Sequence, residues 1–429
     1  MHERKMPATL RFMLAARRSE LLGLEDLSQT CELVTRISQL VHALQKERGY
    51  SNLYLSGNAP HQRLQLDGLS QAADSLERQA RDDFERIGQN GLGSADKTRL
   101  FTRIAYALHS LDELPALRRR IREHRISMQD ATTTLVRLIG GLLAVVFEAA
   151  DTAIDPAITR SLVALFNFMQ GKELAGQERA LGVTGFASGY FTAEMLERLE
   201  HLLECQERSF VTFGRFASPV ALELWHSLCA SPSNDQACRL REIARRTHAD
   251  AQVDRQLGEL WFDLHTARID AMKSVETCLE QDLLQRCQQS MQRVRRDLHS
   301  HRHLLDGLSD MHAAAEQARL FSVHNSDRPT EEGPDANLAR STLDLLQSQT
   351  HRLQGMHDEL REARQALDER KLVERAKQLL IKQQGCSESE AYTRLRQEAM
   401  NQGLRLDEVA QRLLALNAES QAARSRQKH

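Results

Sequence analysis

Residues 27–49 read LSQTCELVTRISQLVHALQKERG, a stretch in which apolar residues recur at the i, i+3, i+4, i+7 spacing of one helix face. The same spacing continues, with short breaks, from Leu27 to Phe321. Only 21 of the 429 residues are Gly and 8 are Pro, and aromatic residues make up 5%. Because β-sandwiches, barrels and propellers need both turn-forming and aromatic residues, we predict an all-α protein built on a long-helix bundle.

Turn signals and one linker divide the chain. The predicted breaks between bundle helices fall at residues 57–60, 88–94, 151–156, 182–189 and 231–235. Residues 322–337, SVHNSDRPTEEGPDAN, combine proline, glycine and charge without an apolar period, which is typical of a linker. We therefore predict an N-terminal extension at 1–26, a helical bundle at 27–321 and a linker at 322–337.

Beyond the linker the apolar period changes. Leucines recur every seven residues, at Leu346, Leu353, Leu360 and Leu367. This spacing predicts a coiled-coil helix over 338–370, which would make the chain a homodimer, although a long helix packed on its own bundle explains the pattern equally well. Residues 371–416 predict three short helices that form a small bundle, followed by a tail at 417–429.

The overall charge gives no general attraction to nucleic acid or membrane. The chain carries 57 basic and 59 acidic residues, for a net charge of −2. Its seven cysteines form no CxxC pair, which favours a reducing compartment over a disulfide framework or a zinc site. The longest apolar run, 138–147, is half of the ~20 residues that a membrane span needs, and arginines interrupt the N-terminal apolar stretch. We expect a cytoplasmic protein without a membrane partner.

A short motif occurs twice in the predicted bundle. QKERG at 45–49 is echoed by GQERA at 176–180, so Arg48 and Arg179 lie 131 residues apart, and each is followed by Ser-Gly. The echo predicts two related helical hairpins. Both arginines have apolar neighbours, and a buried guanidinium needs an anionic partner. If a pseudo-two-fold axis relates the hairpins, the two guanidinium forks face each other and suit a small planar oxyanion; two internal salt bridges would explain the pattern equally well.

The QKERG and GQERA motifs, together with Trp261-Phe262 and TARID at 266–270, resemble the NIT domain, an all-helical nitrate- and nitrite-sensing module of bacterial signalling proteins. The resemblance extends over roughly 27–280. It implies that nitrate or nitrite is the ligand, with no further cofactor, and that Arg48 and Arg179 bind it. Arg239 is a weaker third candidate, as is Arg268.

The segment VERAKQLLIKQQGCSESEAYTRLRQEAMNQGLRLDEVAQRLL at 373–414 resembles the ANTAR domain, an RNA-binding antitermination module. The two resemblances together imply a one-component switch of nitrate assimilation genes. Anion binding would draw the helices of the two arginines together and free the ANTAR-like module to bind a hairpin in nascent leader RNA. A terminator would then not form, and RNA polymerase would read on.

The ANTAR-like segment is only weakly basic. Residues 371–414 hold eight basic and six acidic side chains, so their positive charge must be segregated to one face if they bind RNA. We expect phosphate or loop-base contacts from the following residues: Lys377, Arg394, Arg396 and Arg405. Tyr392 lies on the apolar face and suits a core position better than base stacking.

Two other classes of protein compete with this interpretation. An enzyme is disfavoured, because His299 and His303 have no carboxylate between them in the metalloprotease manner, and the chain has neither a glycine-rich phosphate loop nor a GxSxG motif. We therefore predict no catalytic residue and no metal site. The alternative is a non-catalytic coiled-coil signalling adaptor that binds protein partners; the repeated arginines argue against it, because a scaffold does not use buried guanidinium groups.

Overall fold

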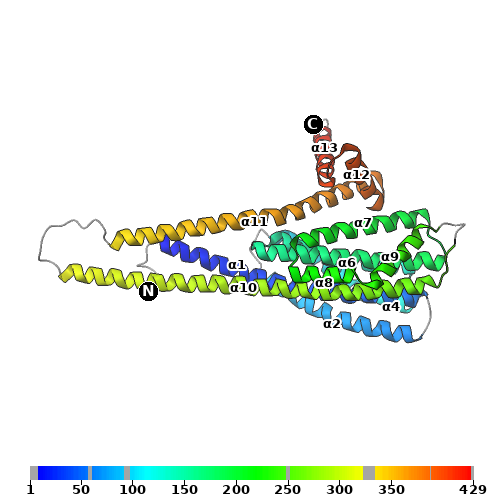
Figure 1. The fold of residues 1–429 in the computed structure, drawn as a ribbon, viewed down its shortest axis with the longest axis horizontal. Helices are drawn as coiled ribbons and strands as arrows, with labels where there is room; N and C mark the ends of the chain where they lie inside the picture. Colours follow the sequence, from blue (N-terminus) through cyan, green and yellow to red (C-terminus); the bar gives the residue numbers. More distant parts are fainter. Residues whose placement is uncertain are drawn as a thin grey trace.

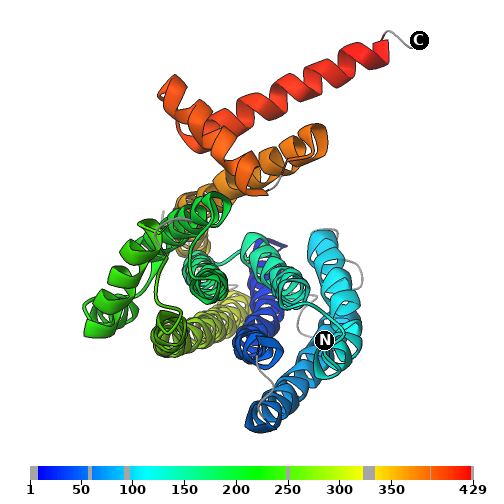
Figure 2. The same ribbon diagram turned by 90° about the vertical axis from the view of Figure 1, so that its right-hand side faces the viewer.

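The protein is almost entirely helical. The computed structural model describes residues 8–56, 60–90, 97–247, 252–321, 334–386 and 388–426, and this part of the chain holds helices and no β-strand. The predicted all-α class is therefore confirmed. Viewed end-on, the blue-to-cyan helices lie beside the green helices, and the small C-terminal module sits at one side of them (Figure 2).

Ten helices form two bundles with the same internal order. The first bundle contains α1 (Ala8–Ser56), α2 (Pro60–Asn90), α3 (Thr98–Asp112), α4 (Leu114–Arg122) and α5 (Met128–Thr152). The second contains α6 (Pro156–Ser188), α7 (Ala193–Phe216), α8 (Pro219–Cys229), α9 (Pro232–Arg245) and α10 (Leu257–Phe321). Helix α1 packs on α2 and α5 as α6 packs on α7 and α10, and α1 also contacts α10 as α6 contacts α5. The predicted pair of related hairpins is thus part of a five-helix repeat with pseudo-two-fold symmetry.

Side-chain caps explain where most of the second-bundle helices begin. Each of four N-cap residues accepts a hydrogen bond from the backbone amide three residues on: Asp155, Thr192, Ser218 and Ser231. Proline occupies the first turn of α6, α8 and α9, where its missing N–H has no helical partner to lose. The predicted breaks at 151–156 and 231–235 are confirmed by these caps.

The break predicted at 182–189 is wrong, because α6 continues through it to Ser188. A Cβ at Gly182 would collide with the indole of Trp261, and one at Gly185 would collide with the ring of Phe191. These glycines therefore allow aromatic rings to pack directly on the helix backbone. The helix ends only at Gly189, whose φ of +85° caps it in the left-handed conformation.

Replacing Gly182 by alanine is expected to destabilise the protein by about 1–3 kcal/mol, because the added methyl group has no space beside the Trp261 ring. Gly140, on α5, is the matched control, since a Cβ there meets nothing within 4 Å. Gly140→Ala should stabilise the helix by roughly 0.5–1 kcal/mol. Urea unfolding of the two variants measures both changes in the free energy of unfolding. Equal changes would show that the contact with Trp261 does not require glycine at position 182.

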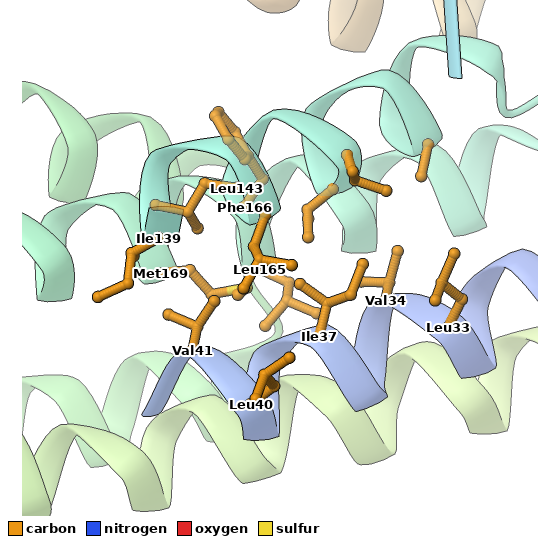
Figure 3. Close-up of a cluster of buried hydrophobic side chains, with 14 of the residues drawn as sticks. Leu33, Val34, Ile37, Leu40, Val41, Ile139, Leu143, Leu165, Phe166 and Met169 are labelled. Atoms are coloured by element: carbon orange, nitrogen blue, oxygen red, sulfur yellow. The ribbon is translucent and has the colours of Figure 1, made fainter. Parts of the chain in front are cut away.

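The two bundles share one continuous hydrophobic core. Figure 3 shows side chains of α1, α5 and α6 meeting at its centre: Leu33, Val34, Ile37, Leu40, Val41, Ile139, Leu143, Leu165, Phe166 and Met169. Interiors of this kind are close-packed and transmit displacement. A shift of α6 is therefore felt by both bundles.

Helix α5 is long and apolar enough to cross a membrane by length and composition alone. However, 56% of its most apolar window is buried inside the protein. Within the described residues it is the one helix that meets these criteria, and its place in the shared core accounts for its apolar character.

The C-terminal region begins with one helix, α11 (Pro334–Gln384), where the sequence predicted a linker, a coiled coil and the start of a separate module. The boundary predicted at 370/371 therefore lies inside a continuous helix. Helices α12 (Glu388–Gln402) and α13 (Leu406–Arg426) complete the expected three-helix module. Two further boundaries differ, since α1 starts inside the predicted 1–26 extension and α13 extends into the predicted 417–429 tail.

The heptad leucines do not all share one environment. Ala363 and Leu367 are buried in the core of the large bundle, and α11 packs on α6 (Figure 1). This half of the seam packs on its own chain. The side chains of Leu346 and Leu353 lie outside the described residues, so the predicted homodimer stays a prediction.

Candidate anion-binding site

Two buried arginines meet where α1 and α6 contact each other. Arg48 and Arg179 are 1% and 4% exposed, and each lies against the backbone three residues before the other. Arg179 Nη2 donates to the carbonyl of Gln45 at 3.2 Å, and the Arg48 guanidinium occupies the space that a Cβ at Gly176 would need. Burial, and then the charge of Arg48, lower the pKa of Arg179 to about 10. The repeat thus brings two like charges together in a buried site.

The two guanidinium groups are bonded differently. Arg48 Nη1 donates to Glu173, whereas its Nε and Nη2 are buried and have no hydrogen-bond partner among the described residues. Arg179 donates from Nη1 to Thr266 Oγ1 at 2.9 Å and lies over the Phe262 ring at 5.2 Å. Buried donors are rarely left unpaired. The Nε–Nη2 edge of Arg48 is the fork that binds planar oxyanions side-on.

A small cavity lies between the arginines. It has a volume of about 10 Å³ and is lined by Arg48, Gly49, Asn52, Leu53, Gly176, Arg179, Ala180, Val183 and Phe262. A volume of this size holds about one water molecule. A larger anion in this space would contact the surrounding side chains closely.

The glutamate that precedes each of these two arginines pairs with a different arginine. Glu47 accepts two hydrogen bonds from Arg118 of α4, at 2.6 and 2.8 Å. Glu178 accepts two from Arg241 of α9, at 2.6 and 3.0 Å. These matched pairs follow the pseudo-two-fold symmetry and hold the short helices on the long ones. Because Glu47 and Glu178 have their own partners, they do not neutralise Arg48 and Arg179.

The alternative of two internal salt bridges applies to only one arginine. Arg48 pairs with Glu173, but in the described part of the chain Arg179 has no carboxylate within ion-pair distance. Arg239 is exposed on α9 and is not among the residues that line the cavity. Arg241, two residues on, is the arginine of this helix that points inward. Arg268 is half-buried, with Nη1 at 3.8 Å from Glu178, and does not line the cavity either.

Sequence reasoning did not identify Glu173, Thr266, Arg118 or Arg241. Their partners lie far away along the chain, with separations of 125, 87, 71 and 63 residues. Helical periodicity reports which face a residue occupies but not which distant residue it meets. The described residues also contain no group of three or more His, Cys, Asp or Glu suited to a metal ion, and the His303 side chain lies outside them.

The C-terminal module rests on the large bundle beside α7 (Figure 1). The Tyr392 ring lies 4.8 Å from the His201 ring, and Arg208 lies 4.4 Å from the centre of the tyrosine ring. Arg396 Nη1 pairs with Glu204 of α7 at 2.5 Å. Tyr392 therefore occupies a contact between two parts of the chain rather than the core of the module alone.

The four predicted RNA-binding residues are all engaged in this arrangement. Lys377 is 7% exposed and pairs with Glu374 and Glu388 at 2.8 and 2.7 Å. Arg405 pairs with Glu369 at 2.6 Å, and exposed Arg394 contacts the side-chain oxygen of Gln384. Of the four, Arg396 is the one whose carboxylate partner belongs to the large bundle.

The contact between module and bundle is loosely packed. A cavity of about 280 Å³ lies among α6, α7, α11 and the module, and its lining includes His201, Arg208, Arg370, Lys377 and Glu388. Small polar contacts that enclose such space resemble weak, transient interfaces more than permanent ones. The contact is therefore suited to release.

Two families match separate parts of the chain. The NIT family, described as nitrate and nitrite sensing, matches residues 39–284, and the ANTAR domain family matches 361–414. A relative described as a nitrate regulatory protein of Klebsiella oxytoca is 32% identical over 412 residues, which cover 96% of each chain. A solved structure described as that of the NasR transcription antiterminator is 32% identical, covers 96% of this chain and 100% of that chain, and has a TM-score of 0.55.

Proposed function

The chain belongs to the family of nitrate regulatory proteins that join a NIT domain to an ANTAR domain, and from this premise we propose how its two ends form one switch. It is a nitrate-responsive transcription antitermination regulator, and both matched families are regulatory rather than catalytic. Nitrate or nitrite binds between Arg48 and Arg179. The observation that carries this proposal is the buried, unpaired Nε–Nη2 edge of Arg48 beside a second guanidinium.

Binding of the anion moves α6. The cavity of about 10 Å³ leaves almost no spare room, so we expect bound nitrate to widen the gap between α1 and α6 or to turn the Phe262 ring. This direction is opposite to the closure expected from charge neutralisation alone. Helix α7 packs along α6, and a ring of Phe210 lies against the backbone at Gly171. Displacement of α6 therefore reaches the helix on which the module rests.

Release of the module exposes its RNA-binding residues. Undocking separates Arg396 from Glu204 and uncovers Tyr392, while Arg394 is already exposed. Lys377 and Arg405 keep their partners on α11 and α12, so we assign them mainly to holding the module together. The freed module binds a hairpin of leader RNA, a terminator does not form, and RNA polymerase reads on. A homodimer in the cytoplasm would double the positive surface.

Reversing the charge of Glu204 is expected to release the module without ligand. In Glu204→Lys, Arg396 faces a like charge across the contact, so leader-RNA affinity in the absence of nitrate should rise about tenfold toward the nitrate-bound value. Glu207→Lys, an equal change at an exposed position of α7, is the control and should leave nitrate dependence intact.

The measurement is RNA binding by the full-length protein, with and without nitrate, for wild type and both variants. Nitrate-dependent RNA binding by wild type supports the proposed function. RNA binding that is equal with and without nitrate in wild type contradicts the switch. Nitrate dependence that persists unchanged in Glu204→Lys contradicts docking through α7.

A further inference from the structure

Glu173 is a buried carboxylate at the arginine pair. It is 2% exposed and accepts hydrogen bonds from Arg48 Nη1, from Gln45 Nε2 at 2.9 Å and from Gln177 Nε2 at 3.1 Å. It therefore takes one terminal nitrogen of Arg48 and leaves the Nε–Nη2 edge available. Glu173 does not occupy the position of the ligand, but its charge acts on the same guanidinium.

The charges around the cavity sum to a single positive unit. Arg48 and Arg179 contribute two positive charges and Glu173 one negative charge. Glu47 and Glu178 are each held by a separate arginine, and Lys46 pairs with Asp270 at 3.1 Å at the more exposed rim. The charge of Arg268 belongs to the cluster at Glu178, whose carboxylate lies 3.8 Å from Arg268 Nη1. One bound monoanion brings this buried charge to zero, whereas a dianion leaves an uncompensated negative charge.

The repeat could have supplied two carboxylates but supplies one. The position equivalent to Glu173 in the first repeat, 131 residues earlier, is His42. Burial, and then the charge of Lys172, lower the pKa of His42 to about 3, so this imidazole is neutral at physiological pH. A second carboxylate would have cancelled the positive charge and removed the attraction for any anion.

We propose that Glu173 determines the anion specificity of this site by reducing two positive charges to one, which restricts the site to monovalent oxyanions and weakens their binding. The inference rests on the proposed function, because it presupposes that the arginine pair binds the anion. Glu173 acts as a specificity residue through Arg48 and need not contact the ligand.

The test is titration of the full-length protein with nitrate and with sulfite, in mildly alkaline buffer where sulfite is mainly a dianion. Glu173→Gln keeps an oxygen that accepts from Arg48 while it removes the charge. We expect the nitrate Kd to fall about tenfold and sulfite to bind measurably. Glu207→Gln removes an equal charge from an exposed position of α7 and, because solvent screens that charge, should change the nitrate Kd less than about twofold.

If wild type binds nitrate and the nitrate Kd of Glu173→Gln is equal to or higher than the wild-type value, the inference is overturned and the proposed function stands. Wild-type protein that does not bind nitrate overturns the proposed function itself. If Glu173→Gln does not unfold cooperatively, the affinities of wild type for nitrate and for sulfite are compared instead. Sulfite bound as tightly as nitrate overturns the charge argument. Nitrate bound at least tenfold more tightly than sulfite supports it.

Discussion

Arg179→Met is expected to abolish the nitrate response without lowering the stability of the ligand-free protein. The side chain is buried, carries a full positive charge beside Arg48, and has no carboxylate partner in the described structure. Its loss removes charge-assisted hydrogen bonds to the anion, which together amount to about 100-fold or more in affinity. An apolar side chain of similar length also removes the repulsion between two buried like charges. Nitrate affinity therefore falls while the stability of the ligand-free protein does not. An arginine with a purely structural role cannot produce this combination.

Calorimetric titration with nitrate and thermal unfolding without it measure the two effects separately. Arg245→Met is the control, because Arg245 is exposed, pairs with Glu200 and does not line the cavity, so the nitrate affinity of this variant should stay at the wild-type value. Arg48→Lys is a third variant. Lysine keeps the positive charge but lacks the two parallel N–H donors of the guanidinium, so nitrate binding should fall. Nitrate binding by Arg179→Met within about threefold of wild type would falsify the two-arginine site.

Glu178→Gln is expected to destabilise the protein by about 3–5 kcal/mol, because it removes a fully buried carboxylate and leaves half-buried Arg241 without its bidentate partner. The same carboxylate accepts hydrogen bonds from Gln206 Nε2 at 2.8 Å and lies 2.9 Å from His265 Nε2, so three helices lose contacts at once. Glu200→Gln is the matched control, since Glu200 also holds an arginine of α9, Arg245, but at the surface. Its loss should cost about 0–1 kcal/mol.

The pH dependence of stability provides a second readout for Glu178. Burial alone would raise its pKa, but the charges of Arg241 and His265 lead the effects that lower it to about 2. Because the folded pKa lies below the unfolded value, this stabilisation is fully present above about pH 4.5 and is lost as the pH falls toward 2. Urea unfolding between these limits should show a steeper acid loss in wild type than in Glu178→Gln. Parallel curves would show that Glu178 does not titrate in this way.

Much of the candidate site was visible in the sequence. The echo of QKERG in GQERA identified Arg48 and Arg179 and suggested a two-fold relation, and the structure places both arginines at one cavity. Arg239, the weaker third candidate, is exposed on α9, whereas Arg241 of the same helix points inward. A shift of two residues turns a side chain by more than half of a helical turn, so position along the chain alone could not separate them.

The sequence by itself determined the helical class, the repeated arginines and the small C-terminal module, because these depend on composition, on local apolar period and on motif spacing. Only the tertiary structure decided which charges are neutralised. Glu173 meets Arg48 across 125 residues, while Arg179 is left without a carboxylate among the described residues. It also decided that Gly182 serves a Trp261 contact rather than a turn, and that Arg396 pairs with Glu204. The physical reason is that helix formation follows from neighbours within four residues, whereas buried charge is balanced by whatever group the folded chain brings into contact.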